Sequence, residues 1–315
     1  MDNPTFIQTV EDLKSSTLDH VSKDDWDEVW DERWVVFADL IGFASMCMYS
    51  DGVTVNNIVR FHRAVNRAAS TIQGLAKFQF TDACYVVTDS AKDALKFASN
   101  VQNECLAFNR VRLDLSHSMF HQMIVPKVTI CKGRVLRLPP AMQSDELTLP
   151  HLEGISKTSM LAGEGIVKAY NLESATTGAL ISATPSDASH LKRLHCDEVS
   201  TPGRAVYNMW RKDTEHTRFN HDGVVDIPWL VLAPAQRSKG VLLLDSWESV
   251  KVKLKSLLGI WRRSFSEHLY ERTPTSTLKQ YGGGITHLCD VVQVMQKVGK
   301  KRWDLSELKS AVESL

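Results

Sequence analysis

The sequence lacks several features that would each mark a class of protein. Its 37 basic and 37 acidic residues cancel, so no overall field draws the chain to nucleic acid or to an anionic membrane. The six cysteines include no Cys-x-x-Cys pair and no Cys/His cluster at zinc spacing, and the eleven histidines include no His-Glu-x-x-His motif. A Gly-rich phosphate loop of the Walker type is also missing. These absences exclude the common zinc motifs and P-loop chemistry.

Long apolar runs are missing too. The longest apolar stretch falls well short of the ~20 residues that a membrane-spanning helix needs. The first residues, MDNPTFIQTVEDLK, are polar and acidic rather than typical of a signal peptide. Cys84 and Cys131 lie in apolar runs, which indicates buried free thiols in a reducing compartment. We therefore expect a cytoplasmic protein.

What is present is an ordinary globular composition, with 43% hydrophobic and 23% charged residues in 315. We predict three regions: an acidic N-terminal lead-in over 1–32, a folded domain over 33–211, and a mostly helical C-terminal extension over 212–315 that packs on the core or on a partner.

Hydrophobic periodicity predicts the elements of the middle region. They are a strand at 34–38, a helix at 53–76, two strands within 78–87 joined near Asp82, a helix at 91–110, a strand at 126–135, a loop-rich insertion at 136–155, a short helix at 165–173, a strand at 179–183 and a hairpin around Gly203. This order predicts an α/β (α+β) fold with a ferredoxin-like core, a mainly antiparallel sheet with helices on one face.

Two aspartates occupy the positions where chemistry is expected. Asp39 and Asp82 each stand at a strand end beside a turn, where a carboxylate can leave the sheet. Such a pair of carboxylates can hold two divalent ions for phosphoryl transfer. Strand-end aspartates are more often simple turn formers, so the surrounding residues must decide.

Three segments around these aspartates resemble the motifs of class III nucleotidyl cyclases. Residues 35–46, VVFADLIGFASM, are similar to the first metal motif, an apolar strand followed by Asp, two residues and Gly-Phe. Residues 81–87, TDACYVV, are similar to the second metal motif. Residues 163–176, GEGIVKAYNLESAT, are similar to the catalytic helix and precede a short strand, as in the family. The resemblance covers roughly 33–211, which makes this region the expected catalytic domain.

The resemblance implies a role for each matching position. Asp39, the Leu40 carbonyl and Asp82 would bind two Mn²⁺ or Mg²⁺ ions, and Asn171 takes the position of the transition-state Arg. The expected substrate-binding residues are Phe37, Gly42, Phe43, Ala44, Phe78, Met160 and Arg204. Among them, the backbone amides at 42–44 would face the phosphates, and Arg204 would contact the triphosphate. An exposed hairpin arginine is an equally good interpretation of Arg204.

Departures from the family pattern concern the base pocket. Adenine enzymes pair Lys with Asp at two positions, and guanine enzymes pair Glu with a small residue. Here those positions hold Phe78 and Met160, whose side chains cannot exchange hydrogen bonds with a purine edge. Two bulkier apolar walls favour a smaller ring, so we expect a pyrimidine nucleoside triphosphate.

The catalytic helix departs as well. Val167 stands at the ribose-positioning Asn, and Asn171 carries no charge at the Arg position. Such a loss removes several kcal/mol of charge stabilisation unless another cation substitutes. Lys168, Lys157 or an arginine within 60–67 is available, and the sequence does not choose among them.

Taken together, these features resemble the pyrimidine cyclases of bacterial Pycsar antiphage systems. The resemblance implies that UTP is converted to cyclic UMP, with CTP as the alternative. It also implies a homodimer with active sites between the subunits, and a separately encoded effector that responds to the product.

Two other hypotheses compete with an active pyrimidine cyclase. The missing Asn and Arg suit an inactive cyclase-like domain that binds a nucleotide or a partner, although both metal aspartates would then have little reason to persist. A diguanylate-cyclase-like palm shares the two-metal logic, but its Gly-Gly-Asp/Glu-Glu-Phe hairpin is absent and Gly282-Gly283-Gly284 is followed by Ile285-Thr286.

Overall fold

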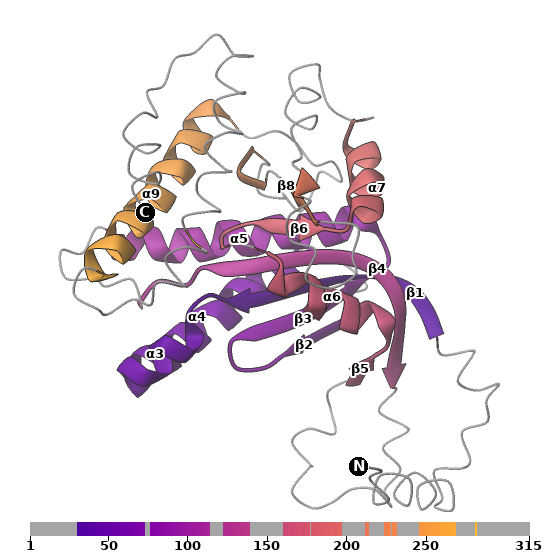
Figure 1. Ribbon diagram of the computed structural model, residues 1–315, viewed down its shortest axis with the longest axis horizontal. Helices are drawn as coiled ribbons and strands as arrows, with labels where there is room; N and C mark the ends of the chain where they lie inside the picture. The colour runs from indigo at the N-terminus through magenta and orange to yellow at the C-terminus, as the bar shows by residue number, and fades with distance from the viewer. Residues whose placement is uncertain are drawn as a thin grey trace, which may run out of the picture.

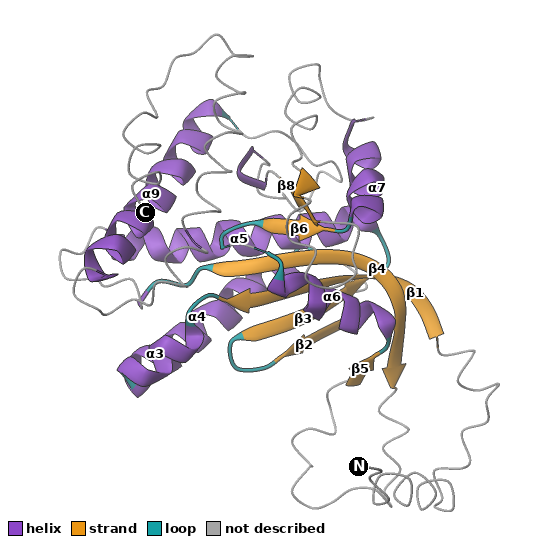
Figure 2. Ribbon diagram, in the orientation of Figure 1, coloured by secondary structure: helices purple, strands orange, loops and turns teal. Residues whose placement is uncertain are grey.

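The described strands of the protein form one mixed sheet with helices on both faces (Figures 1 and 2). In this computed structural model the described residues are 30–72, 76–113, 122–138, 160–176, 178–196, 212–213, 224–227, 229–231, 246–268 and 281.

The eight described strands follow the order β2-β3-β1-β4-β6-β8-β7, and β5 pairs with β4. Neighbouring strands run antiparallel except β4 and β6, which run parallel. The strands are β1 Trp30–Leu40, β2 Ala76–Gln79, β3 Ala83–Thr88, β4 Pro126–Leu138, β5 Met160–Ala162, β6 Ile181–Ala183, β7 Lys212–Asp213 and β8 Val224–Ile227.

Strand β1 lies in the interior of the sheet, between β3 and β4. Residues 34–38 are all buried and apolar, as expected of a strand that is covered on both faces. Because side chains alternate along a strand, Val35, Phe37 and Asp39 share one face, and the residues between them share the other.

The face opposite Asp39 carries the larger core. Helices α4, Asp51–Ala69, and α5, Ala91–Leu113, pack against this face and against each other. Their buried residues recur at helical spacing, as Phe61, Ala64, Val65 and Ala68 do in α4. Helix α7, Pro185–Cys196, contributes Ala188 and Leu191 to the same cluster.

The Asp39 face is covered by one short helix, α6, Glu164–Ser174, which lies across β4 and β1 (Figure 1). The prediction of helices on one face only was therefore wrong, because the apolar face that carries Val35 and Phe37 also needs a cover. Two side chains of β4 bond its backbone: Thr129 Oγ1 donates to the Ala169 carbonyl at 3.0 Å, and Cys131 Sγ donates to the Gly165 carbonyl at 3.3 Å. A Cβ atom on Gly133 would lie 2.7 Å from the Gly165 Cα. The helix therefore sits as close to the strand as two glycines permit.

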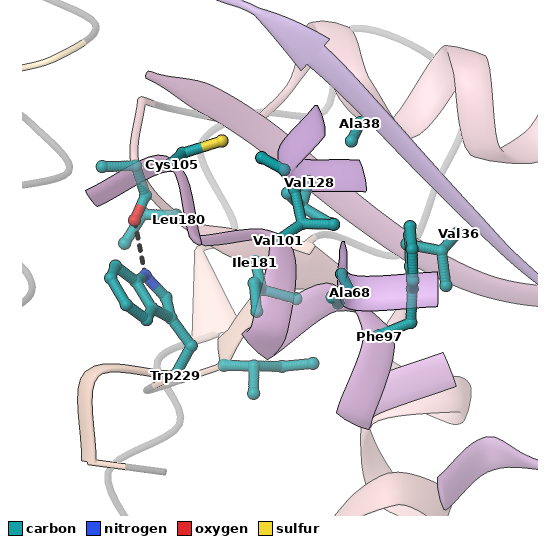
Figure 3. Close-up of a cluster of buried hydrophobic side chains, with 14 of the residues drawn as sticks. Val36, Ala38, Ala68, Phe97, Val101, Cys105, Val128, Leu180, Ile181 and Trp229 are labelled. Atoms are coloured by element: carbon teal, nitrogen blue, oxygen red, sulfur yellow. Dashed lines mark hydrogen bonds between the residues drawn. The ribbon is translucent and has the colours of Figure 1, made fainter. Parts of the chain in front are cut away.

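Residues beyond 212 take part in the same sheet and core. Strand β8 pairs with β6, and the 3₁₀ helix η5, Trp229–Val231, follows it. Trp229 is fully buried, and its Nε1 donates to the Ala179 carbonyl at 2.7 Å (Figure 3). Helix α9, Trp247–His268, packs along α5 and adds Leu254 and Ile260 to the main core. The predicted division at 211 stays a prediction.

The predicted fold class is confirmed, because β1, α4, β2, β3, α5 and β4 follow in the expected order and the sheet is mainly antiparallel. The predicted helix at 53–76 was too long: α4 ends at Ala69, and Ala76 already belongs to β2, whose ladder with β3 draws it into the sheet. Residues 136–138, predicted as part of a loop-rich insertion, extend β4 through pairing with β1 and β5. The rest of that insertion and the hairpin at Gly203 lie outside the described residues.

Among the described helices, none is both long and apolar enough to cross a membrane.

The glycine contact under α6 yields the first prediction. Gly133→Ala should destabilise the protein by about 1–3 kcal/mol, because the added methyl group meets backbone that must shift. Urea unfolding measures this change. Gly52→Ala in α4 is the matched control: its methyl group would meet only Ser50 Oγ at 3.8 Å, so a stability change of zero or a gain of up to ~1 kcal/mol is expected. Equal losses in both variants would contradict the close-contact explanation.

Candidate active site

Asp39 lies at the end of β1, directly between its partners on both sides. It is paired with Ala83 of β3 and with Lys127 of β4. The side chain is partly exposed, on the same face as buried Phe37. The strand therefore carries an acidic group at the point where its apolar run ends.

Asp82 lies in the tight connection between β2 and β3, next to Asp39. Its carbonyl accepts a hydrogen bond of 2.9 Å from the Leu40 amide, so the connection is tied to the residue after Asp39. The Thr81 hydroxyl donates to Asp82 Oδ1 at 2.8 Å. The two carboxylates are close enough that the charge of Asp82 raises the pKa of Asp39.

The pKa of Asp39 is raised to about 7, chiefly because burial penalises the charged form. The positive charge of Lys127 lowers it and the negative charge of Asp82 raises it, both as smaller effects. Within the described part of the chain, no hydrogen-bond donor compensates the Asp39 carboxylate. A partly buried carboxylate without donors is well suited to a cation.

The donor set fits Mg²⁺ or Mn²⁺. Carboxylate oxygens are their preferred protein ligands, and Mg²⁺ is commonly held by one or two carboxylates together with substrate phosphates and water. Over the described residues, no group of three or more His, Cys, Asp or Glu side chains could hold a metal ion. A metal at Asp39 and Asp82 would therefore take its remaining ligands from backbone, water or substrate.

The turn after Asp39 contains Gly42, whose φ of 74° lies in the left-handed region that disfavours a side chain. Helix α3, Phe43–Tyr49, starts directly after it, although the sequence predicted only a turn here. The first bond within the helix runs from the Met46 amide to the Gly42 carbonyl at 3.1 Å. The amides of Phe43 and Ala44 thus precede the first helical hydrogen bond.

Lys127 is a further candidate site residue, which was not predicted from the sequence. It is the cross-strand partner of Asp39, is only 8% exposed, and forms an ion pair with Glu173 of α6. Burial lowers the pKa of Lys127, whereas Asp39 acts in the opposite direction. The available signal was a lysine in the run 124–131, which is apolar apart from Lys127 and Thr129, because buried lysines require a partner.

Aromatic rings form a continuous cluster beside the carboxylates. Phe37 stacks on Tyr85 with ring centroids 4.5 Å apart and contacts Tyr170 of α6 at 5.9 Å. The ring centroid of Phe80 lies 5.9 Å from that of Tyr85 and 5.5 Å from that of Phe78. Burial raises the pKa of Tyr85 to about 12, and Asp39 adds to this shift. Tyr85, Tyr170 and Phe80 were not predicted; the alternation along β3 places Tyr85 on the Asp39 face.

Within this cluster, exposure differs from ring to ring. Phe37 is 2% exposed, whereas Phe80 is 37% and Tyr170 is 60% exposed. The two most exposed of these rings, Phe80 and Tyr170, were therefore not predicted, whereas the predicted Phe37 is buried.

The remaining predicted site residues are less closely joined to the carboxylates. Asn171 lies on α6, next to Tyr170, and no hydrogen bond or ion pair of the described residues joins it to Asp39 or Asp82. Val167 is exposed on the same helix. Met160 belongs to β5, where it pairs with Leu138. Arg204 lies outside the described residues.

The cations proposed from sequence have other partners. Lys168 Nζ donates to the Lys132 carbonyl at 3.0 Å and lies 3.2 Å from Asp187 Oδ2. Arg60 bonds Asn57 and the Gln122 carbonyl. Lys157 lies outside the described residues. Lys127 is the described cation that acts on Asp39.

No protein-family model and no curated protein matches this chain. Several solved structures do. The dimeric guanylyl cyclase domain of the RhoGC fusion protein from the aquatic fungus Blastocladiella emersonii is 18% identical over 52% of this chain and 85% of that chain, with a TM-score of 0.40. A bacterial light-regulated adenylyl cyclase is 12% identical over 54% of this chain and 82% of that chain, with a TM-score of 0.40. The adenylyl cyclase CyaB from P. aeruginosa is 15% identical over 52% of this chain and 83% of that chain, with a TM-score of 0.38.

The raised pKa of Asp39 predicts how stability depends on pH. The folded-state pKa of about 7 lies above the ordinary aspartate value of 3.8, so folding takes up a proton between these values and stability falls as pH rises through that window. Asp39→Asn cannot ionise. Without metal, the free energy of unfolding of Asp39→Asn relative to wild type should therefore rise by on the order of 2 kcal/mol between pH 5 and pH 8.

Urea unfolding in EDTA at several pH values measures this difference. Asp51→Asn, which removes an exposed carboxylate from α4, controls for the change in net charge. A difference between Asp39→Asn and wild type that stays constant over the whole pH range would contradict the burial of an ionisable carboxylate.

Proposed function

We propose that this protein is a metal-dependent nucleotidyl cyclase of the class III type, with 33–211 as its catalytic domain and 212–315 as an extension of it. The observation that carries the proposal is the junction of Asp39 and Asp82 at one end of the sheet, beside the Gly42 turn. Their adjacency arises from the Leu40–Asp82 backbone bond and from the strand register. The three motifs in order along the chain support the same function.

Asp39, Asp82 and the Leu40 carbonyl would hold two Mg²⁺ or Mn²⁺ ions. When bound, the ions supply charge neutralisation at the triphosphate and activation of the attacking hydroxyl. The amides of Gly42, Phe43 and Ala44 orient the phosphates from the start of α3, and Arg204 binds the triphosphate. In this geometry the 3′-hydroxyl attacks the α-phosphate in line and pyrophosphate leaves.

The substrate we favour is UTP, with cyclic UMP as the product. Phe78 belongs to a row of rings rather than to a polar base-reading pair, and Met160 replaces the second polar position. An aromatic surface binds a base by stacking, which is worth about 1–3 kcal/mol. CTP is the alternative substrate, and an inactive nucleotide- or partner-binding domain is the alternative function.

Incubation with each of the four nucleoside triphosphates and Mn²⁺ tests the proposal, with products identified by mass spectrometry. UTP should yield cyclic UMP, and Asp39→Ala and Asp82→Ala should each reduce the rate at least ~10³-fold, because each removes a metal ligand. Asp51→Ala, on the exposed face of α4, should keep the wild-type rate. Absence of cyclic product from all four nucleotides would favour the inactive domain instead.

Lys127 is our choice for the cation that compensates for the uncharged Asn171. Lys127 is the cross-strand partner of Asp39, and its side chain is largely removed from water, where a charge acts more strongly than in solvent. Because one partner of a buried ion pair cannot be removed without cost, the test uses Lys127→Met together with Glu173→Gln.

In the Lys127→Met/Glu173→Gln protein, kcat should fall about 10²-fold. The acidic limb of the pH–rate profile should also move to higher pH, because Lys127 no longer lowers the pKa of Asp39. Lys132→Met, which removes a partly exposed lysine from the same strand, is the control and should leave both quantities unchanged. An unaltered pH–rate profile in the double variant would show that Lys127 acts only structurally.

We further propose a homodimer with active sites between subunits, and a separately encoded effector that responds to the cyclic product in antiphage defence. The exposed side chains of Val167 and Tyr170 on α6 support an interface at this face, since large apolar groups gather where partners dock. These two proposals rest otherwise on the resemblance to the Pycsar cyclases.

A further inference from the structure

Strand β4 has a gap in its pairing on the edge away from β1. Among the described strands, β6 pairs with residues 128–130 on this edge and β5 with residues 136–138, so the residues between them have no strand partner there. Backbone groups of alternate residues point to the same edge of a strand. The Val128 amide bonds the Leu180 carbonyl on this edge at 3.1 Å, and the Lys132 carbonyl therefore points into the gap.

The side chain of Lys168, on α6, supplies a donor to this gap. Its Nζ donates to the Lys132 carbonyl at 3.0 Å and lies 3.2 Å from Asp187 Oδ2. Asp187 belongs to the first turn of α7, where Thr184 Oγ1 donates to the same carboxylate oxygen at 2.7 Å and accepts from the Asp187 amide at 3.3 Å. Lys168 therefore joins three elements, α6, β4 and α7, through one ammonium group.

This ion pair is largely removed from water. The Asp187 side chain is 9% exposed and that of Lys168 is 25% exposed, and a buried carboxylate needs a charged partner. Other polar contacts of α6 with β4 come from Thr129, Cys131 and Lys127, which stand at alternate positions and so share one face of the strand. Lys168 in addition ties the helix to α7, which packs on α5 and β8.

We propose that Lys168 is the positioning residue of α6: its ammonium group takes the place of a strand partner at the gap in β4 and fixes the helix relative to α7. The helix carries Tyr170, Asn171 and Glu173, so its position determines where these side chains stand beside the sheet. The effect of Lys168 on catalysis rests on the proposed cyclase function, whereas its effect on the helix does not.

The reactivity of Cys131 tests the effect on the helix without any nucleotide. The Cys131 thiol is fully buried and donates to the Gly165 carbonyl of α6, so N-ethylmaleimide reaches it only when α6 moves away from β4. In Lys168→Met/Asp187→Asn, which removes both charges together, labelling of Cys131 should be about tenfold faster or more. Burial is the main cause of the raised pKa of this thiol, and Lys168 and Asp187 shift it in opposite directions, so the loss of both charges does not explain a faster reaction.

Cys105 and a second double variant are the controls, with labelling at each cysteine measured by mass spectrometry. Cys105 is buried on α5 in the core of the opposite face, so its labelling rate should stay unchanged. Lys132→Met/Glu32→Gln removes a partly exposed ion pair between β4 and β1 and should leave both rates as in wild type. If the first variant does not fold, Lys168→Gln/Asp187→Asn decides. Equal acceleration at both cysteines would indicate general destabilisation and overturn the proposal, as would an unchanged rate at Cys131.

The assay for cyclic product tests the effect on catalysis. In Lys168→Met/Asp187→Asn, kcat should fall about tenfold while KM for the nucleotide changes less than about twofold, because Asn171 takes the position of a group that acts in the transition state. The control variant should keep both values. Faster labelling of Cys131 with an unchanged kcat would overturn the positioning role in catalysis. If the wild-type protein makes no cyclic product, the proposed function fails, and the labelling of Cys131 alone decides the role of Lys168.

Discussion

The burial of one carboxylate organises this molecule. Asp39 lies near the end of β1, paired through the backbone on both sides, where burial penalises ionisation strongly enough to raise its pKa to about 7. Folding stability alone would favour an uncharged residue at this position. A charge kept at such a position is typical of a functional site, because a bound cation would reverse the penalty.

The surrounding structure serves to hold that carboxylate in place. Gly133 and Gly165 let α6 approach β4, which brings Glu173 to Lys127 and Tyr170 to Phe37. On the other face, α4 and α5 support the sheet, and segments beyond 212 close the same core through Trp229 and α9. The site is therefore built on an interior strand covered from both sides, which limits the movement of its first ligand.

Much of this arrangement follows from local patterns. Hydrophobic periodicity detects features that depend only on residues close together in the sequence. Examples are the apolar run that ends at Asp39, the strand–turn–strand pattern around Asp82 and the amphipathic stripe of α4. The end of α4 was predicted wrongly. The spacing of apolar residues extended the predicted helix to residue 76, whereas pairing with β3 makes this residue part of strand β2. Three site candidates were missed for a similar reason, because each depends on a partner far away along the chain. Lys127 pairs with Asp39, and both Tyr85 and Tyr170 contact Phe37.

The sequence by itself determined the fold class, the two strand-end aspartates and the glycine turn between strand and helix, because these depend on side-chain alternation and on backbone conformations that few residues adopt. Only the tertiary structure decided which charges meet. Strand register places Lys127 opposite Asp39, helix packing brings Glu173 to Lys127, and the gap in β4 lets Lys168 reach Asp187. Coulombic and desolvation energies depend on distance and burial rather than on sequence order, so these groups acquire their properties only when the chain has folded.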